Sequence, residues 1–306
     1  MLPRTDQTAS FDRERPRLVR IAYRMLGSLA EAEDVVQDAW LRWSKVNQAE
    51  IRDSSAFLAR TVTRLCLDHL KSARVRREAY VGPWLPEPLI EQAGPSEDAA
   101  DIEDVTLTLM MALERLSPLE RAAFLLHDVF DVPFDDVART IDRDTAACRQ
   151  LAARARAHVR SQRPRYPLAG EQGAAIAHAF FAASASGDLN QLRTLLAEDA
   201  VAYSDGGGRK PATLNPIYGR DKIIRLFAGL AAKPADGPLQ WLRAATIDGL
   251  PGFISIDRWG TLQTTALAIE KAEIVTIYTV RNPDKLQRVR ELLTDGPDGQ
   301  QAGTRH

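Results

Sequence analysis

Basic side chains gather in two separate stretches of this sequence, and rows of arginine and lysine are suited to binding phosphate. In the stretch 60–77, a single carboxylate, Asp68, stands against Arg60, Arg64, Lys71, Arg74, Arg76 and Arg77. The stretch 149–165 has no carboxylate beside Arg149, Arg154, Arg156, Arg160, Arg163 and Arg165. Guanidinium groups hydrogen-bond to phosphates and to base edges. Both stretches therefore predict nucleic-acid contacts, although a solvated basic helix face would produce the same pattern.

Three carboxylates lie upstream at helical spacing. Glu31, Asp34 and Asp38 are three or four residues apart, so a helix would place them on one face beside an apolar stripe. Such an acidic strip is suited to docking on a basic partner. Alone, the pattern favours an ordinary solvated face, in which Asp38 and Arg42 form an i, i+4 pair worth about 0.2–0.5 kcal/mol.

Four residues in the C-terminal half of the chain could supply an acid or a base to an enzyme, namely His178, Tyr203, Asp205 and Tyr278. They are isolated residues, and His178 lies in an apolar helical pattern typical of a core histidine. A pocket that binds a small molecule without chemistry is a further alternative. We expect no catalytic residue, no metal and no cofactor.

The cysteines and His69 are not spaced as the ligands of a metal ion would be. Cys66 and Cys148 are far apart in helical patterns, so both are interpreted as small core residues. His69 is expected on a helix surface rather than at a metal.

The elements that position these residues fall into several domains, because 306 residues exceed what one hydrophobic core usually organises. A net charge of only −1 argues against a protein that holds DNA by bulk electrostatics. Proline- and glycine-rich breaks follow residues 79 and 163. The predicted organisation is a helical domain at 1–79, a linker at 80–103, a second helical domain at 104–163, an α+β domain at 171–293 and a disordered tail at 294–306.

Helical periodicity dominates the first two domains. An apolar stripe predicts a helix over 31–43, and Ser54 or Ser55 is expected to cap the next one. Ser117 begins a capping box with proline at the first helical position. Further on, a short helix from Phe134, a turn at Asp142-Arg143 and a second helix capped by Asp144 form a helix-turn-helix pattern. Cys148, Leu151, Ala152, Ala155 and Val159 are expected to face inward from that second helix.

After the second break, helical and strand-like stretches are mixed, which indicates an α+β domain. Helices are expected at 174–185 and 220–231, and strands at 239–247, 264–269 and 274–280. A triple glycine at 206–208 permits a close backbone approach to a partner, although a flexible hairpin loop is the simpler interpretation. Asn282-Pro283-Asp284 is expected to end the last strand and to place Lys285 and Leu286 at the domain surface.

Longer stretches of the sequence resemble extracytoplasmic-function (ECF) sigma factors of the sigma-70 family. RPRLVRIAYRMLGSLAEAEDVVQDAWLRW within 11–46 is similar to the sigma region that docks on the polymerase clamp helices, and 54–78 to the segment that reads the minus-ten element. LERLSPLERAAFLLHDVFDVPFDDVARTI with DTAACRQLAARARAHV resembles the domain that reads the minus-thirty-five element. The resemblance implies a non-enzymatic promoter-recognition subunit of RNA polymerase.

The resemblance also implies roles for individual residues. The polymerase-binding residues would be Glu31, Asp34, Gln37, Asp38 and Trp40. The minus-ten residues would be Arg60, Arg64, His69, Lys71, Arg74, Arg76 and Arg77. The minus-thirty-five residues would be Asp144, Thr145, Arg149, Gln150, Arg154, Arg156 and Arg160.

Three further motifs resemble the ECF41-like subgroup, in which a SnoaL-like domain of the NTF2 fold replaces a separate anti-sigma protein. The implied regulatory contacts are Trp84, Leu85, Pro86, Glu87 and Pro88 in the linker, Asp205, Gly206, Gly207, Gly208 and Arg209 in the C-terminal domain, and Asn282, Pro283, Asp284, Lys285 and Leu286 near its end. A stiff proline-rich linker would present Trp84 as an apolar anchor.

The partners implied are core RNA polymerase, through its β′ clamp helices and β flap, and promoter DNA. No membrane contact is expected, since no run of about eighteen apolar residues occurs. The resemblance to the ECF41-like subgroup implies that there is no separate anti-sigma factor. The chain is expected to be cytoplasmic and monomeric when free.

Overall fold

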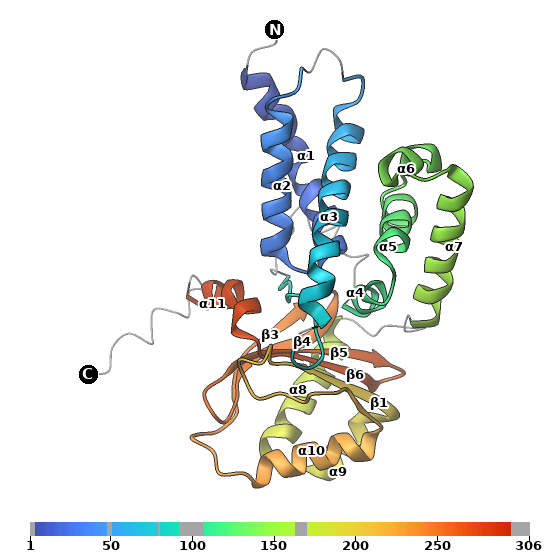
Figure 1. The fold of residues 1–306 in the computed structure, drawn as a ribbon. Helices are drawn as coiled ribbons and strands as arrows, with labels where there is room; N and C mark the ends of the chain where they lie inside the picture. Colours follow the sequence, from blue (N-terminus) through green and yellow to red (C-terminus); the bar gives the residue numbers. More distant parts are fainter. Residues whose placement is uncertain (1–3, 48–50, 79, 92–106, 163–169, 295–306) are drawn as a thin grey trace. The chain divides into compact units, whose positions relative to one another are not determined.

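The computed structural model describes residues 4–47, 51–78, 80–91, 107–162 and 170–294 of the chain (Figure 1). The chain folds into two compact units. One comprises residues 1–79 and 109–163 and is helical, and the other comprises residues 80–108 and 164–306 and contains a β-sheet. The predicted tail lies outside the described residues except for Thr294, which ends a helix.

Three helices form the first part of the helical unit: α1 (Arg4–Leu26), α2 (Leu29–Trp43) and α3 (Ser54–Glu78). Ser28 caps α2. The predicted apolar stripe is buried at Ala32, Val35, Val36, Ala39 and Trp43, whereas its sixth member, Trp40, is half-buried. The cap expected at Ser54 or Ser55 is wrong. Asp53 precedes α3, and its Oδ1 accepts a hydrogen bond from Ala56 N at 2.9 Å.

The second part of this unit contains α4 (Leu107–Glu114) from Leu109 onward, α5 (Pro118–Phe124), a π-helical turn η2 (Leu125–Val129), α6 (Phe134–Ile141) and α7 (Thr145–Gln162). The capping box at Ser117 and Glu120 is confirmed. The helix-turn-helix is also confirmed, because Asp142 adopts a left-handed conformation between α6 and α7 and Asp144 Oδ1 accepts from Ala147 N. Cys148 and Cys66 are both buried, as predicted.

The other unit has helices α8 (Gly170–Ser186), α9 (Leu189–Leu195), α10 (Arg220–Ala232) and α11 (Gln287–Thr294), with a short 3-10 turn η3 (Pro283–Lys285). Its strands are β1 (Leu196–Asp205), β2 (Ile217–Tyr218), β3 (Gln240–Ile247), β4 (Leu250–Ile256), β5 (Leu262–Glu270) and β6 (Glu273–Val280). Among the described residues they form a six-stranded sheet in the order β2-β1-β6-β5-β4-β3. The α+β prediction is confirmed, although β1, β2, β4, α9 and α11 were not predicted.

One pairing in this sheet determines where the functional motifs lie. Strands β1 and β6 run parallel, with Asp205 opposite Val280, whereas the other pairs are antiparallel. The carboxyl ends of two parallel strands lie at the same edge of a sheet. The segments after Asp205 and after Val280 therefore start side by side, although they are far apart in sequence.

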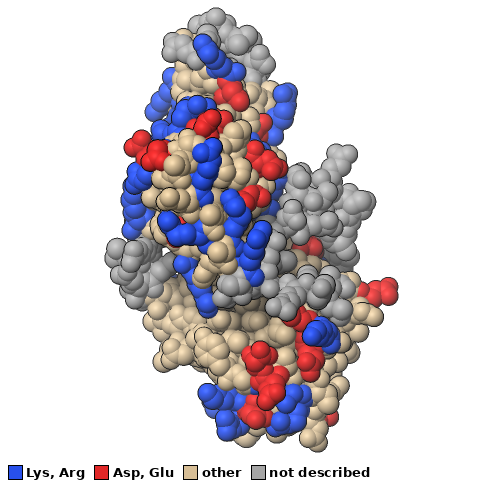
Figure 2. Space-filling view, turned by 90° about the vertical axis from the view of Figure 1, so that its right-hand side faces the viewer, with Lys and Arg blue, Asp and Glu red and all other residues tan. Residues whose placement is uncertain are grey.

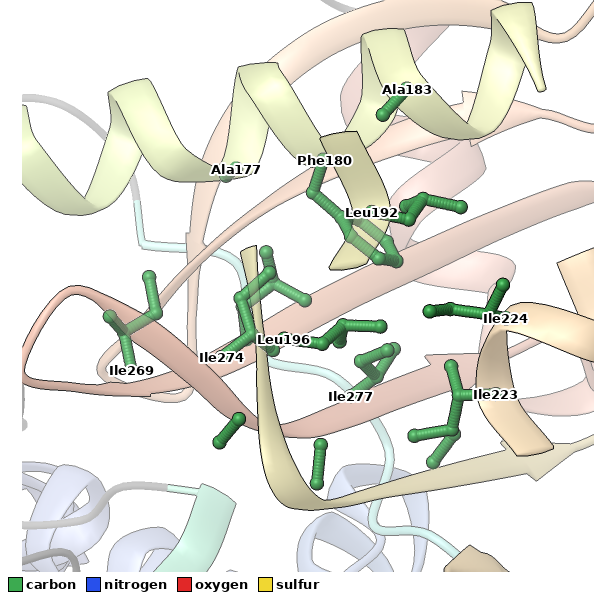
Figure 3. Packing of buried hydrophobic residues seen from close by; sticks show 14 of the residues in the cluster. Ala177, Phe180, Ala183, Leu192, Leu196, Ile223, Ile224, Ile269, Ile274 and Ile277 are labelled. Atoms are coloured by element: carbon green, nitrogen blue, oxygen red, sulfur yellow. The ribbon is translucent and has the colours of Figure 1, made fainter. Parts of the chain in front are cut away.

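Helices α8, α9 and α10 cover one face of the sheet (Figure 1). Phe180 from α8, Leu192 from α9 and Ile223 from α10 pack with Leu196 and Ile277 of the sheet in a buried apolar cluster (Figure 3). This buried core packs the three helices against one face of the sheet.

Candidate DNA-binding and regulatory sites

The acidic strip of α2 is exposed over most of its length. Asp34, Gln37 and Asp38 are exposed, whereas Trp40 is half-buried against the ring of Phe11, with 5.0 Å between ring centroids. Glu31, at the start of the helix, lies 3.1 Å from His69 Nε2 on α3. Helix α2 thus has a carboxylate-rich exposed face beside an apolar face that packs into the core.

The basic residues of α3 are not equally available. Arg64 donates from Nε to the carbonyl oxygen of Thr140 at 3.0 Å and from Nη2 to that of Arg139 at 2.7 Å. Lys71 pairs with Asp68 at 2.8 Å on the exposed surface. The side chains of three further predicted residues lie outside the described part of the chain: Arg74, Arg76 and Arg77. In this arrangement, the guanidinium of Arg64 is hydrogen-bonded to the backbone of α6.

The α7 arginines contact other helices of their own unit. Arg154 Nε lies 2.7 Å from Glu120 Oε1, and Arg156 Nε lies 2.6 Å from Asp128 Oδ1. The guanidinium of Arg149 lies over the ring of Phe134, 5.6 Å from its centroid. The carboxylate partners were missed in the sequence because they come from α5 and η2, not from α7.

Both arginines favour the charged form of their carboxylate, but the net pKa shifts of the two carboxylates are opposite. The hydrogen bond from Arg154 lowers the pKa of Glu120 from its usual value. Burial raises the pKa of Asp128, although the charge of Arg156 opposes that shift.

Lys and Arg side chains are spread over the helical unit with carboxylates between them (Figure 2). Gln150 and Arg160 are exposed on α7, and Thr145 is half-buried at its start, where its hydroxyl contacts Asp135.

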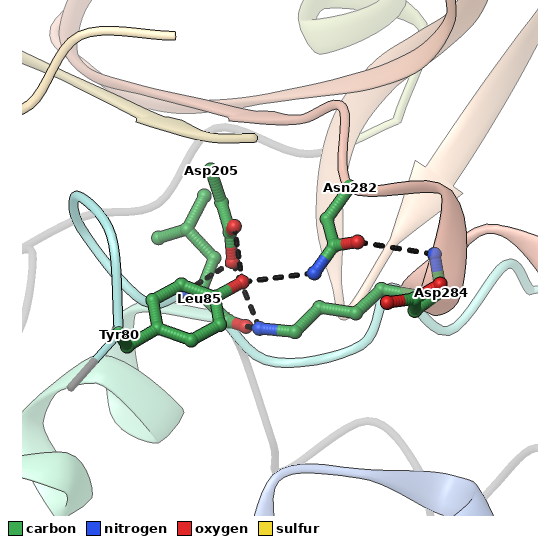
Figure 4. A network of polar contacts seen from close by, with 6 residues as sticks. Tyr80, Leu85, Asp205, Asn282 and Asp284 are labelled. Atoms are coloured by element: carbon green, nitrogen blue, oxygen red, sulfur yellow. Dashed lines mark hydrogen bonds and ion pairs between the residues drawn. The ribbon is translucent and has the colours of Figure 1, made fainter. Parts of the chain in front are cut away.

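The second candidate site is a buried carboxylate, Asp205, at the end of β1. Its side chain is 0% exposed and accepts three hydrogen bonds (Figure 4). Tyr80 OH donates to Oδ1 at 2.6 Å, Leu85 N donates to Oδ2 at 2.9 Å, and Lys285 Nζ lies 2.8 Å from Oδ2. Two of these donors belong to the linker. Asp205 therefore binds the linker and the segment after β6 together.

Tyr80 is held from both sides in this network. Its hydroxyl donates to Asp205 and accepts a hydrogen bond from Asn282 Nδ2 at 2.9 Å. Burial, followed by the hydrogen bond to Asp205, raises the pKa of Tyr80 well above its usual value. The phenol is thus kept neutral as a donor to the carboxylate. Sequence reasoning missed Tyr80, which precedes the WLPEP motif.

Lys285 closes the network from the C-terminal motif. Its ammonium also donates to the carbonyl oxygen of Leu85 and lies over the Trp84 ring, 4.1 Å from the centroid. The expectation that Lys285 and Leu286 lie at the domain surface is wrong, because Leu286 is fully buried and Lys285 lies beneath the linker. Leu85, rather than Trp84, is the fully buried apolar residue of the linker motif.

The triple glycine permits the close approach that was predicted. A Cβ on Gly207 would lie 2.3 Å from Asn282 Nδ2, and Gly207 has a φ of +60°. A Cβ on Gly208 would lie 3.3 Å from Val81 of the linker. Arg209 lies 3.4 Å from the carboxylate of Asp284. The structure thus brings the three predicted motifs together at one edge of the sheet.

The linker continues along the domain to a second carboxylate that the sequence reasoning missed. Asp248 Oδ2 accepts from Leu89 N at 3.3 Å, and Asp248 N donates to Leu89 O at 2.9 Å. Glu91 accepts from Gly249 N at 2.8 Å through its side chain. The Asp-Gly pair at 248–249, with positive φ at both residues, is a tight hairpin turn whose sequence signature could have predicted it. Of the remaining motif residues, Pro86, Glu87 and Pro88 are buried in the linker.

The four candidates for an enzyme do not form one constellation. Asp205 is occupied by the linker, while Tyr203 and Tyr278 stack on each other in adjacent strands with 5.6 Å between centroids. The expectation that His178 is a core histidine is wrong. It is exposed on α8 and contacts the edge of Trp241.

Comparisons with known proteins assign the helical unit. Two family models match, Sigma-70 region 2 over residues 11–76 and Sigma-70 region 4 over residues 106–159. The chain is 36% identical to the ECF RNA polymerase sigma factor SigJ of Mycobacterium tuberculosis, over 91% of this chain and 93% of that protein. The chain belongs to the ECF RNA polymerase sigma factors. The sequence-based assignment to this family is confirmed.

The relationship extends through the C-terminal domain. This sigma factor is 31% identical to a probable ECF RNA polymerase sigma factor, SigI, of the same species, over 94% of this chain and 98% of that one. The crystal structure of the M. tuberculosis SigJ aligns with a TM-score of 0.73 and 33% identity, covering 91% of this chain and 98% of that chain. The fold of two helical sigma domains followed by an NTF2-like, SnoaL-like domain is thus confirmed.

No helix among the described residues is both apolar enough and long enough to span a bilayer. Within the same residues, no group of three His, Cys, Asp or Glu side chains is arranged to hold a metal ion.

Proposed function

We propose that this sigma factor directs core RNA polymerase to its promoters under the control of its own C-terminal domain, which holds the linker between regions 2 and 4. The observation that carries the proposal is the buried Asp205 carboxylate, whose oxygens accept from Tyr80, Leu85 and Lys285. A buried carboxylate loses much of its stabilisation when its donors leave. The docked linker is therefore a defined state, and its release from Asp205 costs free energy.

The helical unit supplies the binding surfaces in this proposal. The exposed carboxylates Asp34 and Asp38, with Gln37, meet a basic surface on the β′ clamp helices, which favours orientation and association rate more than affinity. Basic residues of α3 and α7 contact the minus-ten and minus-thirty-five elements, mainly through phosphates. Region 4 also contacts the β flap.

DNA binding requires a rearrangement within the helical unit. Arg64 is bonded to the carbonyl oxygens of Arg139 and Thr140 in region 4, so it becomes available to phosphate when α3 and α6 separate. The linker joins these two regions, and its docking limits their separation. Promoter elements lie a set distance apart, so docking or release of the linker changes promoter output.

The proposal needs no further regulatory chain. Because the regulatory domain is in the same chain as regions 2 and 4, its effective concentration is high and a modest contact energy suffices. We infer a protein that is monomeric when free, has no separate anti-sigma factor, acts in the cytoplasm and catalyses no reaction of its own.

Promoter-dependent run-off transcription with core polymerase tests the proposal. Leu85→Asp places a second carboxylate beside the buried Asp205 and expels the linker, so transcript yield should change at least threefold from wild type. Leu189→Asp is the matched control, because it makes the same substitution at a leucine that begins α9 and is 36% exposed, and its yield should equal wild type. Deletion of residues 171–306 should also change the yield.

Equal yields from Leu85→Asp, the deletion variant and wild type would remove the regulatory role. Absence of a promoter-dependent transcript from every template, including the gene's own upstream region, would contradict promoter recognition itself.

A further inference from the structure

The β3–β4 turn is hydrogen-bonded to the chain on both sides of residues 92–106. Asp248 N donates to Leu89 O at 2.9 Å, and Asp248 O accepts from Leu107 N at 2.8 Å. Asp248 Oδ2 also accepts from Leu89 N at 3.3 Å. All three residues belong to the α+β unit. Leu89, Leu107 and Asp248 together form the Asp248 junction, in which one residue of a sheet turn holds both the linker and the start of α4.

The conformation and burial of the turn favour these contacts. Asp248 and Gly249 have φ values of 46° and 70°, and aspartate tolerates this left-handed region better than most residues. Asp248 is 2% exposed and Leu107 is 3% exposed. Water therefore competes little for the hydrogen bond between them, which is stronger in such a setting than at the surface.

The linker also extends the sheet next to this turn. Ile90 forms an antiparallel bridge with Ile247 of β3, the last strand in the sheet order, and Glu91 N donates to Thr246 O at 3.0 Å. An extended segment added to a sheet edge gains affinity through main-chain hydrogen bonds. None of these bonds involves Asp205, so they can persist when the contacts of Asp205 open.

Leu107 lies where region 4 begins. The match to Sigma-70 region 4 covers residues 106–159, and Leu107 is the first residue of α4. Leu107 and Thr108 belong to the α+β unit, and the same helix continues into the helical unit from Leu109. The Asp248 junction therefore attaches the first turn of region 4 to the sheet.

A closed junction shortens the chain that separates region 2 from region 4. From position 79 to Leu89 the fully extended chain reaches at most about 36 Å, whereas from position 79 to Leu107 it reaches at most about 100 Å. The minus-ten and minus-thirty-five elements lie about 25 base pairs apart, which is roughly 85 Å of duplex. The junction therefore limits how far apart the two elements can be when both are bound.

We propose that Asp248 is a positioning residue for region 4, and that the Asp248 junction sets the longest promoter spacer that this sigma factor accepts. The inference deepens the proposed function and rests on promoter recognition by regions 2 and 4. Opening the junction lengthens the tether without changing a residue that contacts DNA. It therefore changes the preference for spacer length rather than the affinity for either element.

Run-off transcription by the holoenzyme from promoters that differ only in spacer length tests the proposal. Leu107→Pro removes the N–H that Asp248 O accepts, and proline is tolerated at the first position of a helix. The measured quantity is the yield with two base pairs added to the spacer, divided by the yield with the best wild-type spacer. This ratio should rise at least threefold over wild type, which is the effect of one lost hydrogen bond.

Leu107→Ala is the matched control. It also removes the leucine side chain but keeps the N–H, so its ratio should equal that of wild type. A ratio that is the same for Leu107→Pro and Leu107→Ala overturns the role of the hydrogen bond between Leu107 and Asp248.

A second pair of variants tests the other side of the junction and leaves α4 intact. Asp248→Ala removes the oxygen that accepts from Leu89 N, so the ratio should rise at least twofold. Asp248→Asn keeps a side-chain oxygen and tolerates positive φ, so its ratio should return to the wild-type value. A merely structural role would lower the yield from every spacer by the same factor and leave the ratio unchanged, which overturns the proposal.

These outcomes separate the inference from the proposed function. Absence of a transcript at every spacer length contradicts promoter recognition, and the positioning role with it. Transcription with one spacer preference in wild type, Leu107→Pro and Asp248→Ala overturns the positioning role of Asp248 alone and leaves promoter recognition in place.

Discussion

Two lysine–aspartate pairs of this protein have the same length and opposite surroundings. Lys285 lies 2.8 Å from Asp205 and Lys71 lies 2.8 Å from Asp68. In the first pair the side chains are 12% and 0% exposed, and in the second they are 75% and 70% exposed. Water screens the second pair and leaves both partners available, whereas the first cannot open without leaving a charge in an apolar setting. The same distance thus belongs to a solvent-screened surface pair in one region and to a structural clamp in the other.

Breaking the buried pair should have the largest effect. Asp205→Asn leaves Lys285 beneath the linker without its counter-charge, so the free energy of unfolding of the C-terminal unit should fall by about 3–5 kcal/mol. Denaturant unfolding followed by tryptophan fluorescence measures it. Asp68→Asn is the matched control and should change stability by less than about 0.5 kcal/mol. Equal effects of the two substitutions would contradict the distinction between clamp and surface.

A backbone substitution tests the same clamp without changing a charge. Gly207→Ala puts a Cβ against Asn282 at a φ of +60°, which should destabilise the protein by about 1–3 kcal/mol. Gly229 lies inside α10 with open space around it, so Gly229→Ala should instead stabilise by about 0.5–1 kcal/mol. Thermal unfolding of both variants checks the sign. A neutral Gly207→Ala would show that the loop does not need its close approach.

Alkaline pH should loosen the clamp through Tyr80. Its pKa is raised in the folded protein, so above the usual tyrosine value of 10.0 the unfolded chain loses this proton first. The folded state then binds more protons, and stability falls as pH rises. Tyr80→Phe removes this contribution, so its stability should decline less steeply than that of wild type above about pH 10. Parallel slopes in pH-dependent unfolding would argue against a protonated Tyr80 in the clamp.

Breaking the exposed pair of Lys71 and Asp68 should have the smallest effect on stability, and its main effect should be on DNA binding. Lys71→Gln should change the free energy of unfolding by less than about 0.5 kcal/mol. Promoter affinity of the polymerase holoenzyme should fall, and the slope of its logarithm against the logarithm of salt should decrease by about one. Filter binding at several salt concentrations measures that slope. An unaltered slope would show that Lys71 does not contact phosphate.

Sequence patterns succeeded where the determining residues are neighbours in the chain. The capping box at Ser117, the turn at Asp142 and the cap at Asp144 each depend on contacts within four residues, and all three are present. The buried face of α2 followed from its periodicity. Even so, the cap of α3 was placed one or two residues late, because Asp53, Ser54 and Ser55 are all suitable caps.

Sequence patterns gave wrong or missing predictions where the conformational preference of a segment differs from what its tertiary environment imposes. Strand β4 is buried almost throughout, yet Pro251 and Gly252 within it are typical of a break. Strand β1 begins with the alanine- and acid-rich sequence Leu196–Ala200, which has little strand preference. His178 lies in an apolar stretch but on the outer side of α8, since a helix of mostly small residues does not define its buried face clearly.

By itself, the sequence determined the helical elements, the helix-turn-helix, the sigma family and the residues of the three motifs, because these depend on short-range order and residue type. Only the tertiary structure decided which charges meet. Asp205 joins Tyr80, 125 residues away, and Lys285, 80 residues away, because the parallel pairing of β1 and β6 puts both strand ends at one edge of the sheet. The burial that makes this contact a clamp arises when the linker covers it, and no local pattern encodes that burial.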